Sequence, residues 1–316
     1  MFESILVPLD GSTHAEAALP FAKAIAARTA ARLILVRTAQ NPSPLGDVTY
    51  QQQHHTLERA VDYLALMSDD LIAQGFDVKT GVPYAGSAAE WIVEESQFRK
   101  ADLIVMATHD RVGPDRWVHG SVAEGVVHTS SAPVLLVRSH AAEQRAQRFN
   151  AAQPVLIVPL DGSDLAEAAL PLARAMAHTL HARVILVGVV PRAGQLVAGQ
   201  VGAIVTYVGA DLDALEAEAK AYLEASAARV GVMPGVEAVV RYGDPAAEIA
   251  ALAEEHAAAA VVMATHGRTG LVRAMLGSVA GGVLHHSKTP VLLIRPAVLR
   301  PAEQPIQSAV AVPLTG

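Results

Sequence analysis

The chain of 316 residues is long enough for two domains of about 150 residues each, and its 52% hydrophobic and 17% charged residues exclude intrinsic disorder. It has no cysteine, which excludes disulfides and cysteine metal sites, and its net charge of −7 argues against a partner nucleic acid held through phosphate contacts. No apolar run approaches the ~18 residues of a transmembrane helix, so we expect no membrane insertion.

A tandem repeat organises the chain. ILVPLDGS at residues 5–12 returns as LIVPLDGS at residues 156–163, and MATH at residues 106–109 returns at residues 263–266. The offset between the matches grows from 151 to 157, which places six extra residues in the middle of the second copy. The chain is therefore predicted to be a duplicated domain.

The repeat divides the chain into four parts. The two copies occupy residues 1–138 and 154–296. Residues 139–153 are polar and charged without a strand pattern and are predicted to be a linker, and residues 297–316 are predicted to be a disordered tail. The start, Met1–Ser4, shows no secretory signal peptide, so we expect a cytoplasmic protein.

Each copy alternates short apolar runs with helical segments, which is typical of an α/β domain with a parallel sheet and helices on both faces. The elements predicted for the second copy are, in chain order, a strand at 155–158, a helix from 164, a strand at 183–189, a loop at 191–210, a helix at 211–230, a strand at 236–241, a helix from 245, a strand at 260–264, a glycine loop, a helix from 278 and a strand at 291–294. The first copy follows the same course. Asp164 with Glu167, and Thr13 with Glu16, have the spacing of capping boxes.

Two loops of unusual composition follow the first and fourth strands of the second copy. They span residues 159–163 and residues 265–278. In a doubly wound sheet, ligands bind beyond the carboxyl ends of the strands, at the point where the strand order reverses. If these two strands are neighbours there, both loops face one crevice.

The second of these loops has the chemistry of an anion site. Gly277 and Ser278 open a helix, whose free amides and dipole attract phosphate, and Arg268 adds positive charge. The alternative is that Gly267 and Gly270 only form a turn and Ser278 only caps the helix. Residues of the first loop are equally ambiguous, because Asp161 and its counterpart Asp10 either close an Asx turn or bind a ribose hydroxyl or a metal on a polyphosphate.

Motifs for other chemistry are missing. The sequence has neither the P-loop pattern nor the Rossmann G-x-G-x-x-G, and no Ser/His/Asp set is evident. His178 and His181 are three residues apart on a helix, but no third ligand accompanies them, so no metal site is predicted. We expect no catalytic residues.

These residues resemble the universal stress protein family in its tandem form. Members that bind ATP carry G-x-x-G, nine residues and G-[ST] after the fourth strand, and Gly267, residues 268–276 and Gly277-Ser278 fit that spacing, with Ala264 in place of the first glycine. The resemblance implies that the second copy binds ATP, with Mg²⁺ as an option and AMP as another ligand. It assigns the contacts to Pro159, Asp161 at the ribose, Val189 at the adenine, Ala264, His266, Gly267, Arg268, Gly270, Gly277, Ser278 and Val279.

The resemblance also implies a sheet order of 3-2-1-4-5 and pairing through the last strand of each domain. Those strands, Val134–Val137 and Val291–Ile294, are apolar and would aggregate as open edges. We expect them to pair antiparallel within one chain, and association of two chains into a homodimer is a further option.

The two copies are predicted to be unequal. The first copy has Asp110 where the second has Gly267, and this carboxylate would repel the phosphates of a nucleotide. A weaker site remains there, formed by Pro8, Asp10, Thr38, Gly120 and Ser121.

Three function classes are compatible with the sequence. The favoured one is an adenine-nucleotide-binding stress-response or signalling protein. An interaction protein that binds no nucleotide and assembles through sheet edges is the second. The third is an enzyme, at most a very slow ATPase, for which no catalytic motif is present.

Overall fold

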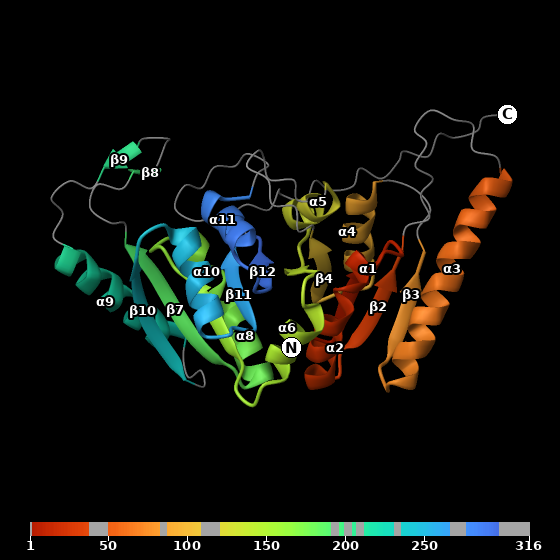
Figure 1. The fold of residues 1–316 in the computed structure, drawn as a ribbon, viewed down its shortest axis with the longest axis horizontal. Helices are drawn as coiled ribbons and strands as arrows, with labels where there is room; N and C mark the ends of the chain where they lie inside the picture. Colours follow the sequence, from red (N-terminus) through yellow and green to blue (C-terminus); the bar gives the residue numbers. More distant parts are fainter. Residues whose placement is uncertain are drawn as a thin grey trace, which may run out of the picture.

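The computed structural model describes residues 2–37, 50–82, 87–108, 121–190, 196–198, 204–206, 212–230, 235–265 and 276–296. These residues form one twisted sheet of ten strands with helices packed on its two faces (Figure 1). The strands of the first copy are β1 (Ser4–Pro8), β2 (Arg32–Val36), β3 (Val78–Gly81), β4 (Leu103–Thr108) and β5 (Val134–Arg138). Those of the second copy are β6 (Val155–Pro159), β7 (Arg183–Val190), β10 (Val236–Tyr242), β11 (Ala260–Ala264) and β12 (Val291–Ile294).

The helices alternate with these strands, as the sequence predicts. In the first copy they are α1 (Thr13–Glu16), α2 (Leu19–Thr29), α3 (Tyr50–Ala73), α4 (Ala88–Phe98) and α5 (Ser121–Thr129). In the second copy they are α7 (Asp164–Glu167), α8 (Leu170–Leu180), α9 (Leu212–Val230), α10 (Pro245–Glu255) and α11 (Ser278–His286). No helix within the described ranges is both long enough and apolar enough to cross a membrane.

Both copies have the doubly wound topology. The sheet order is β10-β7-β6-β11-β12-β5-β4-β1-β2-β3, which gives 3-2-1-4-5 within each copy. Within the ten-stranded sheet, every pair inside a copy is parallel. The predicted fold class is therefore confirmed. One feature was not predicted: within the loop at 191–210, β8 (Leu196–Ala198) and β9 (Ile204–Thr206) pair as a separate antiparallel ladder.

The two half-sheets meet at β5 and β12. These strands are antiparallel, with Val291 opposite Leu136 and Leu293 opposite Val134. Apart from Arg138 at the end of β5, both strands are apolar and almost fully buried. Pairing them satisfies the backbone N–H and C=O groups that each half-sheet would otherwise leave open along its edge.

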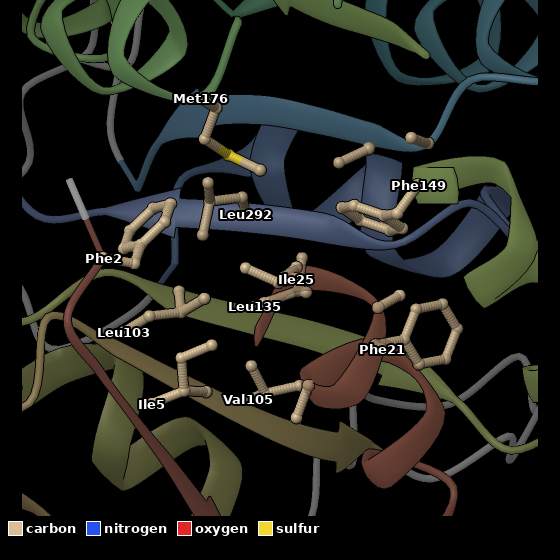
Figure 2. Close-up of a cluster of buried hydrophobic side chains, with 14 of the residues drawn as sticks. Phe2, Ile5, Phe21, Ile25, Leu103, Val105, Leu135, Phe149, Met176 and Leu292 are labelled. Atoms are coloured by element: carbon tan, nitrogen blue, oxygen red, sulfur yellow. The ribbon is translucent and has the colours of Figure 1, made fainter. Parts of the chain in front are cut away.

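Residues of each strand alternate between two cores, one on each face of the sheet. Ile5 and Val7 of β1 lie in the core under α2 and α8, whereas Leu6 lies in the core under α4 and α10. Figure 2 shows that the first core is continuous across the β5–β12 pair, the seam between the two half-sheets. Leu135 and Ile25 of the first copy lie beside Leu292 and Met176 of the second. The two copies therefore share their hydrophobic interior.

The predicted linker at 139–153 is folded and takes part in this shared core. It forms α6 (Ala142–Ala146) and a 3-10 helix (Gln147–Asn150). Phe149 is fully buried, and its ring packs edge to face against the Phe21 ring, with the two ring centroids 6.1 Å apart. The sequence pattern gave no sign of this, because a single buried aromatic residue in a polar segment creates no periodicity.

Two arginines of this segment bind one carboxylate of the second copy. Arg145 Nη1 lies 3.5 Å from Glu254 Oε1, and Arg148 Nη2 lies 3.3 Å from Glu254 Oε2. Burial alone would raise the pKa of Glu254, but hydrogen bonding and charge from Arg148, the charge of Arg145 and the Thr289 hydroxyl together lower it below 4.5. The contact fastens the linker to the helix α10.

Because the pKa of Glu254 is lowered on folding, its contribution to stability is complete above pH 4.5 and is lost as the pH falls through the folded pKa. We expect Glu254→Gln to reduce the free energy of unfolding at pH 7 by about 1 kcal/mol, the scale of two partly exposed ion pairs. The difference from the wild type should shrink as the pH is lowered below 4.5. Urea unfolding at several pH values checks this, with the exposed Glu94→Gln as the control, and an equal loss at every pH would contradict it.

Candidate functional site

The switch point of each half-sheet lies where the sequence places it. In the second copy, β6 pairs with β7 on one side and with β11 on the other. In the first copy, β1 lies in the same way between β2 and β4. The chain therefore leaves β6 and β11 at the same edge of the sheet, which is the edge where doubly wound folds bind ligands.

The turn after the first strand of each copy is an Asx turn. Asp161 Oδ1 accepts hydrogen bonds from the Ser163 N–H at 3.1 Å and the Ser163 O–H at 2.6 Å, and Asp10 Oδ1 accepts one from the Ser12 N–H at 2.8 Å. Both carboxylates remain exposed at the edge of the sheet. The turn thus holds each carboxylate in a fixed place, and a carboxylate has further lone pairs for a ligand.

The capping boxes predicted one residue later are wrong. Ser12 and Ser163 are the N-caps, and their hydroxyls accept the N–H groups of Ala15 and Ala166. Asp164 is instead the first residue of α7. Ser12 and Ser163 are the N-caps because the Asx turn holds each serine in the extended backbone conformation that an N-cap requires.

Glu16 and Glu167, expected in the capping boxes, bind tyrosines that the sequence analysis missed. Tyr63 OH donates to Glu16 Oε1 at 2.7 Å, and Tyr222 OH donates to Glu167 Oε1 at 2.9 Å. Burial, and then the bond to Glu167, raise the pKa of Tyr222 to about 12; the pKa of Tyr63 rises for the same two reasons. Each pair joins the long helix α3 or α9 to the last residue of the short helix α1 or α7. The pair recurs in both copies, and this recurrence is the signal in the sequence that could have identified it.

Gly277 and Ser278 lie at the amino end of α11. The Gly277 N–H donates to the Thr265 carbonyl at 2.9 Å, which fastens the start of the helix to the end of β11. Gly277 is the N-cap and Ser278 is the first helical residue, with its side chain exposed, so the alternative that Ser278 caps the helix is wrong. The amides of Ser278 and Val279 belong to the first turn, where the helix itself supplies no acceptor.

Three other predicted residues lie at the carboxyl ends of adjacent strands. Pro159 ends β6, Val189 is the penultimate residue of β7, and Ala264 ends β11. Ala264 is not among the described non-glycine residues with positive φ. An alanine therefore replaces the family's glycine there without strain.

The rest of the predicted site lies outside the described residues. This applies to His266, Gly267, Arg268 and Gly270 in the second copy and to Thr38, Asp110 and Gly120 in the first. Ser121 begins α5, but its side chain is outside the described part as well. No three metal-ligating side chains gather among the residues that the structure describes.

A hollow of about 230 Å³ opens at the switch point of the first copy. Pro8 and Asp10, predicted for the weaker site, line it. The remaining walls come from the ends of β2 and β4 and from the helices α1, α4 and α5. Its lining residues are Pro8, Leu9, Asp10, His14, Ala15, Val36, Ala88, Trp91, Ile92, Met106, Ala107, Val122 and Ala123.

Comparison with known proteins decides the family. The model of the universal stress protein family matches residues 1–138 and again residues 155–295. The chain belongs to the universal stress protein family. It carries two copies of the domain in tandem.

Relatives and solved structures agree with this assignment. A universal stress protein of Thermus aquaticus is 36% identical over 141 residues, which is all of that protein and 44% of this chain. The Mycobacterium tuberculosis universal stress protein Rv2005c is 30% identical over 203 residues, and the alignment spans 62% of each chain. A universal stress protein from Archaeoglobus fulgidus has the same fold, with a TM-score of 0.66 at 20% identity over 92% of this chain and 96% of that chain.

The glycines of the two Asx turns allow a matched test. Gly162 has φ +83° and Gly11 has φ +88°, the left-handed region, so alanine at either position should cost about 1–2 kcal/mol of unfolding free energy. A Cβ at Gly11 would also lie 2.9 Å from the Arg37 guanidinium carbon, whereas a Cβ at Gly162 meets no atom within 4 Å. The Arg37 guanidinium ends a flexible side chain and can move aside, so Gly11→Ala should exceed Gly162→Ala in urea unfolding only by the contact of Arg37 with the Tyr63 ring, about 0.5–1 kcal/mol. The excess should disappear in an Arg37→Ala background, and the absence of any loss at both glycines would contradict the described turns.

Proposed function

We propose that this universal stress protein binds ATP in the crevice of its second copy and acts as a cytoplasmic nucleotide-binding protein of the stress response. The observation that carries the proposal is the approach of two features at one switch point. The exposed Asp161 follows β6, and the amino end of α11 is hydrogen-bonded to the residue that follows β11. A carboxylate suits a ribose diol, and a helix amino end suits phosphate.

Within this proposal the nucleotide spans the crevice from β7 to α11. The adenine contacts the backbone near Val189, the ribose hydroxyls donate to Asp161, and the phosphates accept from the amides of Ser278 and Val279. Gly277 leaves room for the phosphates because it carries no side chain. Mg²⁺ would enter with the polyphosphate, since the described residues offer no cluster that holds a metal alone. AMP fits the same crevice with fewer phosphate contacts.

Substitutions at the start of α11 test the phosphate site. Ser278→Ala removes one hydroxyl and leaves the amides, so we expect about ten-fold weaker ATP binding. Gly277→Val should weaken binding further. Its φ of −55° is open to valine, so obstruction of the phosphates, and not backbone strain, is the expected cause. Isothermal titration calorimetry measures both, and unchanged ATP affinity in Gly277→Val would show that the site lies elsewhere.

The copies should also differ in stoichiometry. We expect about one ATP per chain, because Asp110 in the first copy replaces Gly267 and places a carboxylate among the phosphates. Two like charges about 4 Å apart near a protein surface repel by roughly 4 kcal/mol, enough to prevent tight binding. Asp110→Gly should raise the stoichiometry toward two. Equal occupancy of both crevices by ATP in the wild type would overturn this prediction.

The proposal is for binding, with ATP turnover at most very slow. An interaction protein without a nucleotide is the competing function, and analysis of the purified, denatured protein for released nucleotide by mass spectrometry distinguishes the two. The β5–β12 pairing within the chain leaves β3 and β10 as the outer strands of the described sheet, so such a protein would assemble through one of these. Association of two chains would then use other surfaces of the molecule.

A further inference from the structure

The two ends of α11 are held by different copies of the domain. At its amino end, the Gly277 N–H donates to the Thr265 carbonyl of its own copy. At its carboxyl end, Arg138 of the first copy donates from Nη2 to the Leu284 carbonyl and, at 3.1 Å, to the His285 carbonyl. The last carbonyls of a helix have no partner within it, so Arg138 supplies donors that α11 itself cannot.

The antiparallel seam is what brings Arg138 to this helix. Arg138 is the last residue of β5, and Leu136 of the same strand pairs with Val291 at the start of β12. Since α11 ends at His286, shortly before β12 begins, the end of β5 lies beside the end of α11. Arg138 also pairs with Thr108 at the end of β4, next to the switch point of the first copy.

The repeat shows the same arrangement in the opposite direction. Arg138 and His285 correspond to Arg295 and His128 at the offset of 157. Burial lowers the pKa of His128 in the last turn of α5; the charge of Glu124 opposes this effect, and the charge of Arg295 adds to it. Arg295 therefore lies near the carboxyl end of α5. Each copy thus contributes an arginine to the far end of the helix that follows the fourth strand of the other copy.

We infer that Arg138 is a positioning residue for the phosphate site that we propose in the second copy, so the inference rests on the proposed function. The helix α11 has nine residues and is about 14 Å long. Its amino end is fastened to its own copy and its carboxyl end to the first copy. The directions of the Ser278 and Val279 amides are therefore set by both copies, and the site is complete only while Arg138 holds the far end of the helix.

A contact in the middle of α11 makes its two ends interdependent. Gly282 packs against Ala246 of α10 so closely that a Cβ on the glycine would overlap the alanine Cβ. Such a contact at one point allows the helix to tilt about it, so a shift at the carboxyl end also moves the amino end. Loss of the Arg138 contact should therefore displace the amides while the helix stays folded.

Helix position, and not the charge of Arg138, is the expected cause of the effect. The guanidinium lies at the opposite end of α11 from the proposed phosphates, about 14 Å away along the helix. This distance exceeds the Debye length of about 8 Å at physiological ionic strength, so the direct electrostatic effect on a nucleotide is weak. A displacement of the amides, by contrast, does not depend on salt.

Arg138→Met in the full-length chain tests this inference, because methionine keeps most of the apolar stem and removes the donors. Isothermal titration calorimetry should show ATP binding about five-fold weaker than in the wild type. The difference should persist when NaCl is raised from about 0.05 M to about 0.5 M.

Arg28→Met is the matched control. Arg28 also crosses between the copies and donates to the last residue of a helix, the Leu180 carbonyl of α8, at 3.0 Å. We expect this variant to lower the free energy of unfolding, as Arg138→Met does, and to leave the ATP affinity unchanged. A general loss of stability would affect both variants alike.

Amide hydrogen exchange tests the same contact without nucleotide. In the nucleotide-free chain, the amides of α11 should exchange at least about three-fold faster in Arg138→Met than in the wild type, while those of α5 keep their rate. Arg295→Met should accelerate exchange in α5 and leave α11 unchanged. Arg28→Met should leave both helices as they are.

The possible results separate this inference from the proposed function. If the wild type binds no ATP, the proposed function fails and the inference fails with it. If the wild type binds ATP and a folded Arg138→Met chain binds it equally well, only the inference fails. Equal weakening in Arg28→Met, a difference that disappears at high salt, or unchanged exchange in α11 would each overturn it as well.

Discussion

Backbone hydrogen bonds between β5 and β12 turn two five-stranded sheets into one. Each of these strands is apolar on both faces, so each would be an open, aggregation-prone edge if its domain stood alone. Antiparallel pairing closes both edges at once. It also places helices of both copies over the same hydrophobic core, so the core under α2 and α8 contains side chains from both copies. The pairing therefore covers, within one chain, an edge that a single copy would leave open.

The folded linker completes the seam. Phe149 fills the shared core beside Phe21, while Arg148 donates to the Ala258 carbonyl at 3.2 Å and binds Glu254. Arg28 of the first copy reaches the Leu180 carbonyl of the second at 3.0 Å. These contacts join the copies on both sides of the sheet, since Arg28 reaches the end of α8 and Arg148 reaches α10. They restrain the halves against rotation about the single pair of strands that joins them.

The sequence predicts the fold well and the contacts between elements less well. The inner strands are predictable because each is a short apolar run buried on both faces, as at Val155–Pro159, and the repeat shows each run twice. Phe149 is not predictable, because its contact with Phe21 leaves no local pattern. The Tyr63–Glu16 and Tyr222–Glu167 pairs join residues far apart in the chain, so only their recurrence in both copies marks them. The N-caps were misplaced by one residue for a related reason. Ser163 and Asp164 have similar capping propensities, and only the hydrogen bond to Asp161 favours the serine.

The two crevices share their framework because the framework is fixed by packing. Gly125 of α5 lies against Ala89 of α4, and Gly282 of α11 lies against Ala246 of α10, so closely in each case that a Cβ on the glycine would overlap the alanine. A larger residue at either glycine would move the helix away from its neighbour. The amino end of α11, which we propose holds the phosphates, thus depends on a contact one turn further along the helix.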